Sequence, residues 1–193
     1  MTRDSRRTGG GTLFTEPVLV VDRKATPAGS GREFGVFDQH GDRLGAVVEI
    51  GRGLLRKALH LFPNCDQFLT SRFEVRDAGG SVVLKVTRPA KMVPSRFLVT
   101  RADGTPIGEI SRESTPGRIR FAFTARGRPV GQLHAERDFS ITDADGLEVA
   151  HGAPTADNYV VEVHDHLSDP LASMVVAAAL TVDTALKQAG HDT

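Results

Sequence analysis

One segment near the C-terminus, Asp169–Val182, is the only long helical signal in this chain, and it has no polar face. Asp169 is suited to cap a helix N-terminus, Pro170 to the first helical position and Gly190 to the far end, so we expect a helix over residues 169–189. A helix that is apolar all round must be buried in protein or in lipid. The rest of the sequence has to decide between a barrel threaded by a helix and a protein with a membrane span.

The length of the apolar stretch favours burial in protein. It runs for twelve uncharged residues from Leu171 to Val182, whereas a bilayer span needs about 20 apolar residues. Asp183 and Lys187 then follow at the i, i+4 spacing expected where a helix surface reaches water. A membrane-spanning helix remains the alternative.

A repeated pattern of strand and turn occupies the body of the chain. Each copy has a phenylalanine, a β-branched residue two positions later and a turn closed by glycine, which is typical of β-hairpins. The copies start at Phe34, Phe73, Phe97 and Phe139, with turn glycines Gly41, Gly80, Gly104 and Gly146, and Gly127 marks a looser copy. Ten to twelve short antiparallel strands are expected, which suit a closed barrel or a sandwich. The interior of a barrel of that size must be filled by other parts of the chain, and the apolar helix can fill it.

Length and composition indicate one domain. With 193 residues, of which 39% are hydrophobic, the chain can bury one substantial core. We expect a flexible arm over residues 1–12, the barrel domain over 13–189 and a short tail over 190–193. The single cysteine, Cys65, excludes an internal disulfide framework and a multi-cysteine zinc site. The charged N-terminus is followed by no apolar segment of the secretory type, so we expect a cytoplasmic protein.

The charge of the chain is zero in total but unevenly distributed. Residues 51–128 contain fifteen Lys/Arg against six Asp/Glu, whereas residues 134–193 contain two against eleven. Two interpretations are open. The opposite charges neutralise each other across a compact fold, or a basic surface meets an anionic partner.

A second, shorter helix is expected between two of the hairpins. Its apolar side is formed by Leu54, Leu55, Ala58, Leu59 and Phe62, its basic side by Arg52, Arg56 and His60, and Pro63 ends it. It is either a lid on the barrel with a solvated basic side or a helix that lies on anionic lipid.

Motifs that carry chemistry are few. The run from Asp143 to Glu148 begins like a calcium loop but lacks the distant glutamate, and it coincides with a hairpin turn. His164 and His166 have no third metal ligand at motif spacing. No set of acid, base and nucleophile stands out, so we expect no enzyme, no metal and no cofactor. The neutral total charge and the lack of stacking motifs argue against nucleic-acid binding.

Several ordered motifs resemble the phospholipid scramblase family. They are Leu13-Phe14-Thr15-Glu16, the Phe-x-Val-x-Asp-x-x-Gly hairpins, Asp66-Gln67-Phe68, Thr87-Arg88-Pro89-Ala90-Lys91, Ala156-Asp157-Asn158-Tyr159 and the closing Asp169-Pro170-Leu171 helix. That family is similar to the plant LURP-one-related proteins and the Tubby C-terminal domain. The resemblance implies a closed antiparallel β-barrel of about twelve strands around a central hydrophobic C-terminal helix.

The resemblance also implies a function at lipid surfaces. We expect a peripheral module that binds anionic phospholipid or phosphoinositide headgroups at the inner face of the plasma membrane. The candidate headgroup-binding residues are Arg52, Arg56, Lys57, Arg88, Lys91 and Arg96. The cysteine cluster and the acidic calcium segment of eukaryotic scramblases are not intact here. Two alternatives remain: a soluble scaffold that binds a protein partner, and a genuine scramblase whose C-terminal helix spans the membrane.

Overall fold

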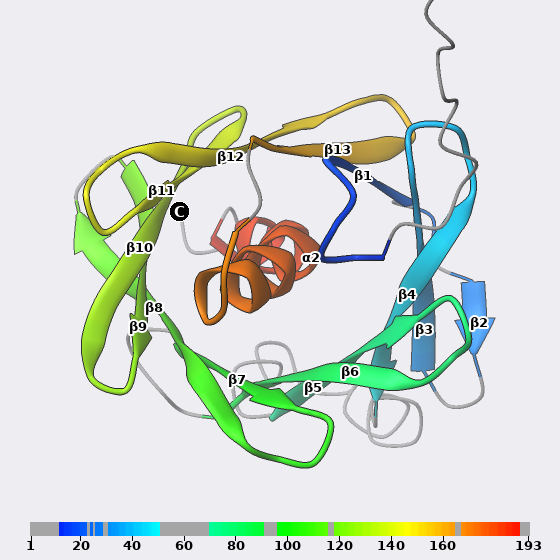
Figure 1. The fold of residues 1–193 in the computed structure, drawn as a ribbon, viewed down its shortest axis with the longest axis horizontal. Coiled ribbons are helices and arrows are strands. Elements are labelled where there is room, and N and C mark those ends of the chain that lie inside the picture. The colour runs from blue at the N-terminus through cyan, green and yellow to red at the C-terminus, as the bar shows by residue number, and fades with distance from the viewer. Residues whose placement is uncertain are drawn as a thin grey trace, which may run out of the picture.

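A computed structural model describes residues 12–22, 24, 26–28, 31–50, 70–90, 96–115, 118–164 and 167–189. These residues form one antiparallel sheet and one helix, labelled as in Figure 1. The strands are β1 (Val18–Asp22), β2 (Thr26–Ala28), β3 (Gly31–Phe37), β4 (Arg43–Ile50), β5 (Ser71–Asp77), β6 (Val82–Arg88), β7 (Arg96–Arg101), β8 (Pro106–Thr115), β9 (Arg118–Ala125), β10 (Arg128–Ala135), β11 (Phe139–Asp143), β12 (Glu148–Pro154) and β13 (Asn158–Val163); the helix is α2 (Leu171–Ala189).

The sheet closes into a barrel because its first and last strands meet. From β3 to β13 every strand pairs with its neighbours in the sequence, and β1 pairs with both β13 and β3. On β3, strand β1 pairs with Val36 and Phe37 while β2 pairs with residues 31–33, so β1 and β2 share one edge. The ring therefore has twelve positions, as expected, and Figure 1 shows it surrounding α2.

The hairpin turns are those that the repeat predicts. Gly41, Gly80, Gly104, Gly127 and Gly146 all have positive φ, between 74° and 90°, where a side chain would be strained. Because every odd-numbered strand from β3 to β11 ends in one of these turns, all five lie at the same end of the barrel. We call this the turn end. The first residues of β5, β7, β9, β11 and β13 lie at the opposite end.

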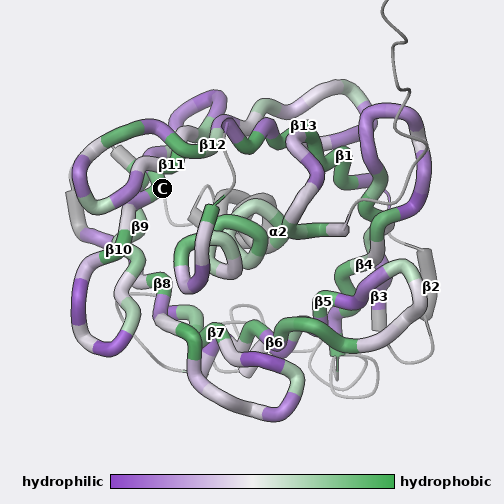
Figure 2. The backbone as a smooth tube through the Cα atoms, viewed as in Figure 1, coloured by the Kyte–Doolittle hydropathy of each residue, from purple (hydrophilic) through white to green (hydrophobic). Residues whose placement is uncertain are grey.

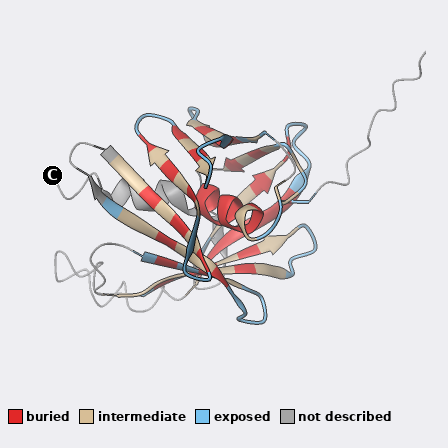
Figure 3. Cartoon of the chain, turned by 60° about the vertical axis from the view of Figure 1, so that its left-hand side comes forward, coloured by how far each residue is buried: buried red, intermediate tan, exposed pale blue. Residues whose placement is uncertain are grey.

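Helix α2 fills the interior of the barrel, which confirms the expectation of protein burial. Every residue from Ala172 to Leu180 is buried, on all sides of the helix, as Figure 3 shows. Figure 2 shows apolar residues on the helix and on the strands around it. Among the residues the structure describes, no helix combines the length and the apolar character that crossing a bilayer requires.

Glycines let the helix approach the sheet closely. A Cβ on Gly108 of β8 would lie 2.5 Å from the Thr124 carbonyl oxygen and 3.0 Å from the Met174 sulfur. On β10, a Cβ on Gly131 would lie 3.2 Å from a methyl group of Leu171. Any larger side chain at these two positions would push the helix away from the wall.

The start of the helix differs from the sequence prediction. The helix begins at Leu171 and not at Asp169, and Asp169 and Pro170 form the turn that leads into it. Four expected features lie outside the described residues: the short helix over residues 54–62, Cys65, the tail over 190–193 and residues 1–11 of the arm expected over 1–12.

Candidate functional site

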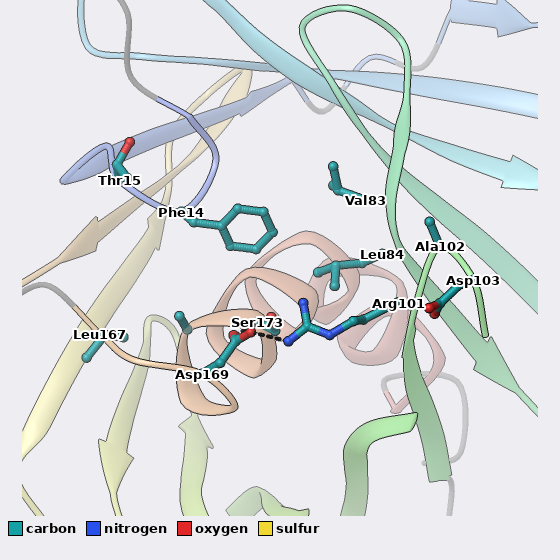
Figure 4. A pocket seen from close by; sticks show the side chains of 11 residues that line it. Phe14, Thr15, Val83, Leu84, Arg101, Ala102, Asp103, Leu167, Asp169 and Ser173 are labelled. Atoms are coloured by element: carbon teal, nitrogen blue, oxygen red, sulfur yellow. Dashed lines mark hydrogen bonds and ion pairs between the residues drawn. The ribbon is translucent and has the colours of Figure 1, made fainter. Parts of the chain in front are cut away.

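A cavity of about 770 Å³ opens at the turn end of the barrel, above the start of α2 (Figure 4). One part of its lining is apolar and comes from Phe14, Val83, Leu84, Leu167 and Ala172; the rest is polar and comes from Thr15, Arg101, Asp103, Asp169 and Ser173. The cavity therefore combines an apolar wall with a charged one.

The charged wall is an ion pair between the hairpin of β7 and β8 and the start of the helix. Arg101 Nη2 lies 2.6 Å from Asp169 Oδ2, and the two side chains are 51% and 42% exposed. Ser173 Oγ donates a hydrogen bond of 2.7 Å to Asp169 Oδ1. Desolvation, the largest single effect, raises the pKa of Asp169, but the hydrogen bonds from Ser173 and Arg101 together outweigh it and hold that pKa below its usual value. Both carboxylate oxygens of Asp169 are thus already occupied.

Arg101 departs from the hairpin repeat, and the sequence analysis missed it. The same position is an aspartate in three other hairpins: Asp38, Asp77 and Asp143. Each of these aspartates accepts backbone N–H bonds within its own turn. In the hairpin of Arg101, Asp103 takes this role instead. Its carboxylate accepts a hydrogen bond of 2.8 Å from the backbone N–H group of Thr105. Alignment of the repeats could have revealed the substitution, but not the partner.

The uneven charge of the sequence becomes an uneven charge around the barrel. Because strand order follows chain order, residues 70–90, 96–115 and 118–135 form one continuous wall over β5–β10, with eleven Lys/Arg and five Asp/Glu. Residues 136–164, over β11–β13, form the adjoining wall, with one Lys/Arg and seven Asp/Glu. We call these the basic wall and the acidic wall.

Part of the charge of the basic wall is paired internally. Arg76 lies 2.7 Å from Glu74, and Arg96 lies 2.9 Å from Glu109. Arg72 on β5 and Arg126 and Arg128 at the turn of β9 and β10 are exposed and make no ion pair within the described part of the chain.

The structure places two of the six predicted headgroup-binding residues. Arg88 ends β6 and Arg96 begins β7, so both lie at the end of the barrel opposite the turn end. Arg96 is on the outer face, whereas Arg88 is half-buried and follows buried Leu84 and Val86 on the inward side of β6. Arg52, Arg56, Lys57 and Lys91 lie outside the described residues.

The other candidate motifs resolve as turns or as isolated groups. Asp143 accepts the N–H groups of Asp145 and Leu147 within a hairpin turn, as predicted. His164 Nε2 lies 3.9 Å from Glu148 Oε1. Within the described ranges, no cluster of three His, Cys, Asp or Glu side chains has the geometry of a metal site.

Comparison with known proteins supports the fold. No protein-family model and no curated protein matches the chain. The X-ray structure of AT5G01750, a LURP-one-related protein from Arabidopsis thaliana, matches with a TM-score of 0.54 and 17% sequence identity, and the match covers 91% of this chain and 99% of that chain. At this identity the likeness shows a shared barrel fold.

Proposed function

We propose that this protein is a peripheral module that binds anionic phospholipid surfaces through its basic wall. The observation that carries the proposal is the segregation of charge around the barrel: a surplus of six positive charges, from eleven basic and five acidic residues, on six neighbouring strands. Each Lys or Arg near an anionic membrane surface contributes about 1 kcal/mol to binding. Several exposed arginines on one wall are therefore enough for reversible association.

The closed interior supports binding at the outer surface. The helix occupies the space that a hollow barrel would offer to a ligand. Three charged side chains line the cavity at the turn end: Arg101 and Asp169 already pair with each other, and Asp103 accepts a hydrogen bond from the Thr105 N–H group. The outer face of the basic wall carries exposed arginines that are left for an external anion, and we place the function there, at a cytoplasmic membrane surface.

Sedimentation with vesicles tests this proposal. Vesicles with 30 mol% phosphatidylglycerol should bind the protein, phosphatidylcholine vesicles should not, and binding should fall steeply with salt because the attraction between exposed charges is screened. Binding to both vesicle types that does not respond to salt would contradict the proposal, as would no binding to either.

Two sets of charge-neutralising substitutions locate the surface. Arg72→Gln, Arg126→Gln and Arg128→Gln together should leave the melting temperature nearly unchanged but weaken binding by about 10- to 100-fold. The matched control neutralises three carboxylates of the acidic wall, Asp145→Asn, Glu148→Gln and Glu162→Gln. If binding depends on the basic wall, this control does not weaken it.

The predicted basic helix is tested in the same assay. Arg52→Gln, Arg56→Gln and Lys57→Gln together should weaken vesicle binding without changing the melting temperature. If binding is unchanged, these three side chains are not part of the lipid-binding surface.

A further inference from the structure

The cavity at the turn end lies where the packing of the barrel interior is loose. In three other hairpins the residue three positions after the turn glycine is buried: Leu44, Ile107 and Val149 are 6–8% exposed. The equivalent residue of β6, Val83, is only half-buried and lines the cavity. Apolar side chains at this hairpin therefore border open space that their counterparts do not have.

A β-bulge gives one wall of this cavity a continuous apolar surface. The pairing of β5 with β6 shifts between Val75 and Arg76, and Val83 is the extra residue on β6. A bulge redirects side chains that would otherwise alternate between the two faces of a sheet. Val83 and Leu84 are consecutive in the chain, yet both line the cavity and both contact the core.

The start of α2 leaves room for a ligand. Ala172 and Ser173, the helix residues that line the cavity, have small side chains. Phe14 and Leu167 add apolar side chains from the segments before β1 and α2, and both are half-buried. The volume of about 770 Å³ lies within the range of about 300–1,000 Å³ that is typical of small-molecule sites, which occur in the mouths of β-barrels among other places.

Arg101 borders this space with hydrogen-bond donors that are not in use. A guanidinium group carries five N–H groups. Within the described part of the chain, its only hydrogen bond runs from Nη2 to Asp169. Figure 4 shows Asp169 on one side of the guanidinium and the side chains of Phe14 and Leu84 on another. Donors of Arg101 are therefore left for an acceptor that enters the cavity.

The carboxylates that line the cavity are already engaged as acceptors. Asp169 accepts from Arg101 through Oδ2 and from Ser173 through Oδ1. Asp103 accepts the N–H group of Thr105 in its own turn. A ligand that only donates hydrogen bonds would have to displace these contacts, whereas a ligand that accepts would use the donors of Arg101.

The charges at the cavity favour a neutral ligand. Arg101, Asp103 and Asp169 sum to −1, and Lys85, which donates to the carbonyl oxygen of Ala102 at the cavity, brings the sum to zero. An anion on Arg101 would lie close to the carboxylate of Asp169. A cation would find both oxygens of that carboxylate occupied. Burial of an ion without a free partner of opposite charge costs free energy, which a neutral acceptor does not incur.

We propose that this cavity binds a free, small and neutral molecule that is mainly apolar and carries one hydrogen-bond acceptor, such as a ketone or ester oxygen. The acceptor takes a hydrogen bond from Arg101, and the apolar part packs against Phe14, Val83 and Leu84. The site lies apart from the outer face of the basic wall, so it goes beyond the proposed membrane binding and does not depend on it.

Titration with three compounds of equal chain length tests the charge of the ligand. At pH 7, 2-nonanone is neutral, nonanoate is an anion and nonylammonium is a cation. With about ten non-hydrogen atoms, 2-nonanone should move the methyl NMR signals of Val83, Leu84 and Leu167 with a Kd of about 0.1–1 mM. Each ion should bind at least about tenfold more weakly. Equal or tighter binding of either ion would overturn the inference.

Two leucines outside the cavity report non-specific binding in the same spectra. Leu98 on β7 is 38% exposed and Leu147 in the turn of β11 and β12 is 65% exposed. Their methyl signals should stay in place. Shifts confined to these two leucines, or shifts of equal size throughout the protein, would contradict binding in the cavity.

Filling the cavity should prevent binding. Val83→Phe places a ring in the space, and Leu167→Phe does so from the opposite wall, so each should weaken binding of 2-nonanone at least about tenfold. Leu98→Phe enlarges a side chain outside the cavity and is the matched control, which should bind as the wild type does. Melting temperatures verify that each variant is folded. Undiminished binding by a folded filling variant would overturn the inference.

The role of Arg101 is tested separately. Arg101→Met keeps the length of the side chain but removes its donors, so 2-nonanone should bind about fivefold more weakly, the effect of roughly one hydrogen bond. Arg126→Met, on the neighbouring hairpin, should leave the affinity unchanged. If Arg101→Met also leaves it unchanged, the acceptor is not recognised and the proposed chemistry is wrong.

Vesicles separate this site from the proposed function. Phosphatidylcholine vesicles present ester oxygens within a bilayer and should move none of the three cavity signals; shifts would make the ligand a membrane lipid instead of a free molecule. The variant with Arg72→Gln, Arg126→Gln and Arg128→Gln should bind 2-nonanone normally. If 2-nonanone binds but anionic vesicles do not, the function fails and the site stands. If vesicles bind but 2-nonanone does not, the site fails and the function stands.

Discussion

Arg101 at the tip of one hairpin is joined to Asp169 at the start of the central helix, with Nη2 and Oδ2 2.6 Å apart. The two residues are 68 positions apart in the chain. The contact ties the wall of the barrel to its filler at the turn end. Arg101 makes this contact from the position that is an aspartate in three other hairpins.

Substitution of Arg101 should destabilise the fold moderately. Both side chains are about half exposed, so water screens the pair, and Arg101→Gln should lower the free energy of unfolding by about 0.5–1 kcal/mol. Arg101→Asp should cost more, although it restores the aspartate of the repeat, because it sets two carboxylates side by side. Urea unfolding measures both, with Arg126→Gln on the neighbouring turn as a control. A stabilising Arg101→Asp would show that the turn matters more than the ion pair.

The same contact predicts a dependence on acid pH. The pKa of Asp169 is lowered in the folded protein, so its carboxylate contributes stability that is complete above the unfolded pKa of about 4 and is lost as the pH falls through the folded pKa. The stability difference between wild type and Arg101→Gln should be constant from pH 5 to 7 and shrink below about pH 4. Urea unfolding at pH 3, 5 and 7 checks this, and a difference that persists at pH 3 would contradict it.

Charges in the buried part of the helix should prevent folding. Val175 and Ala178 are each 1% exposed, and an unpaired carboxylate there costs several kcal/mol against a total stability of about 5–15 kcal/mol. We expect Val175→Asp and Ala178→Asp to yield insoluble or unfolded protein. Leu147→Asp, at a position 65% exposed, is the control and should fold. Cooperative melting of both helix variants would refute central burial.

Close packing of helix and sheet predicts a further cost. Gly108→Ala places a methyl group 2.5 Å from a backbone oxygen of β9, which cannot swing aside, so the variant should lose about 1–3 kcal/mol. Gly79→Ala is the matched control, because a Cβ there lies 3.4 Å from one flexible carboxylate. Thermal melting distinguishes them, and equal melting temperatures would show that β9 and α2 both shift to make room for the methyl group.

Most of the fold could be predicted from the sequence, because the same hairpin pattern recurs along the chain. Each hairpin contains its own turn glycine, so local patterns predict the strands of the barrel. A helix without a polar face is stable in water only when a core buries it, so its own sequence predicts that α2 lies inside. The contact of Arg101 with Asp169 could not be predicted, because it joins distant segments. Which side chains lie opposite one another on adjacent strands could not be predicted either, because strand register is fixed by pairing across turns and bulges and is not visible in any one strand.

The position of the helix also predicts how the protein behaves toward lipid transport. To line a path across the bilayer, α2 would have to leave the barrel, and the inward side chains of twelve strands would lose their packing. The purified protein should therefore catalyse negligible exchange of labelled lipid between the leaflets of reconstituted vesicles, with or without calcium. It should also leave membranes in high salt or carbonate, as a protein held by surface charge does. Rapid calcium-stimulated exchange, or retention on carbonate-washed membranes, would instead favour a helix that leaves the barrel and enters the bilayer.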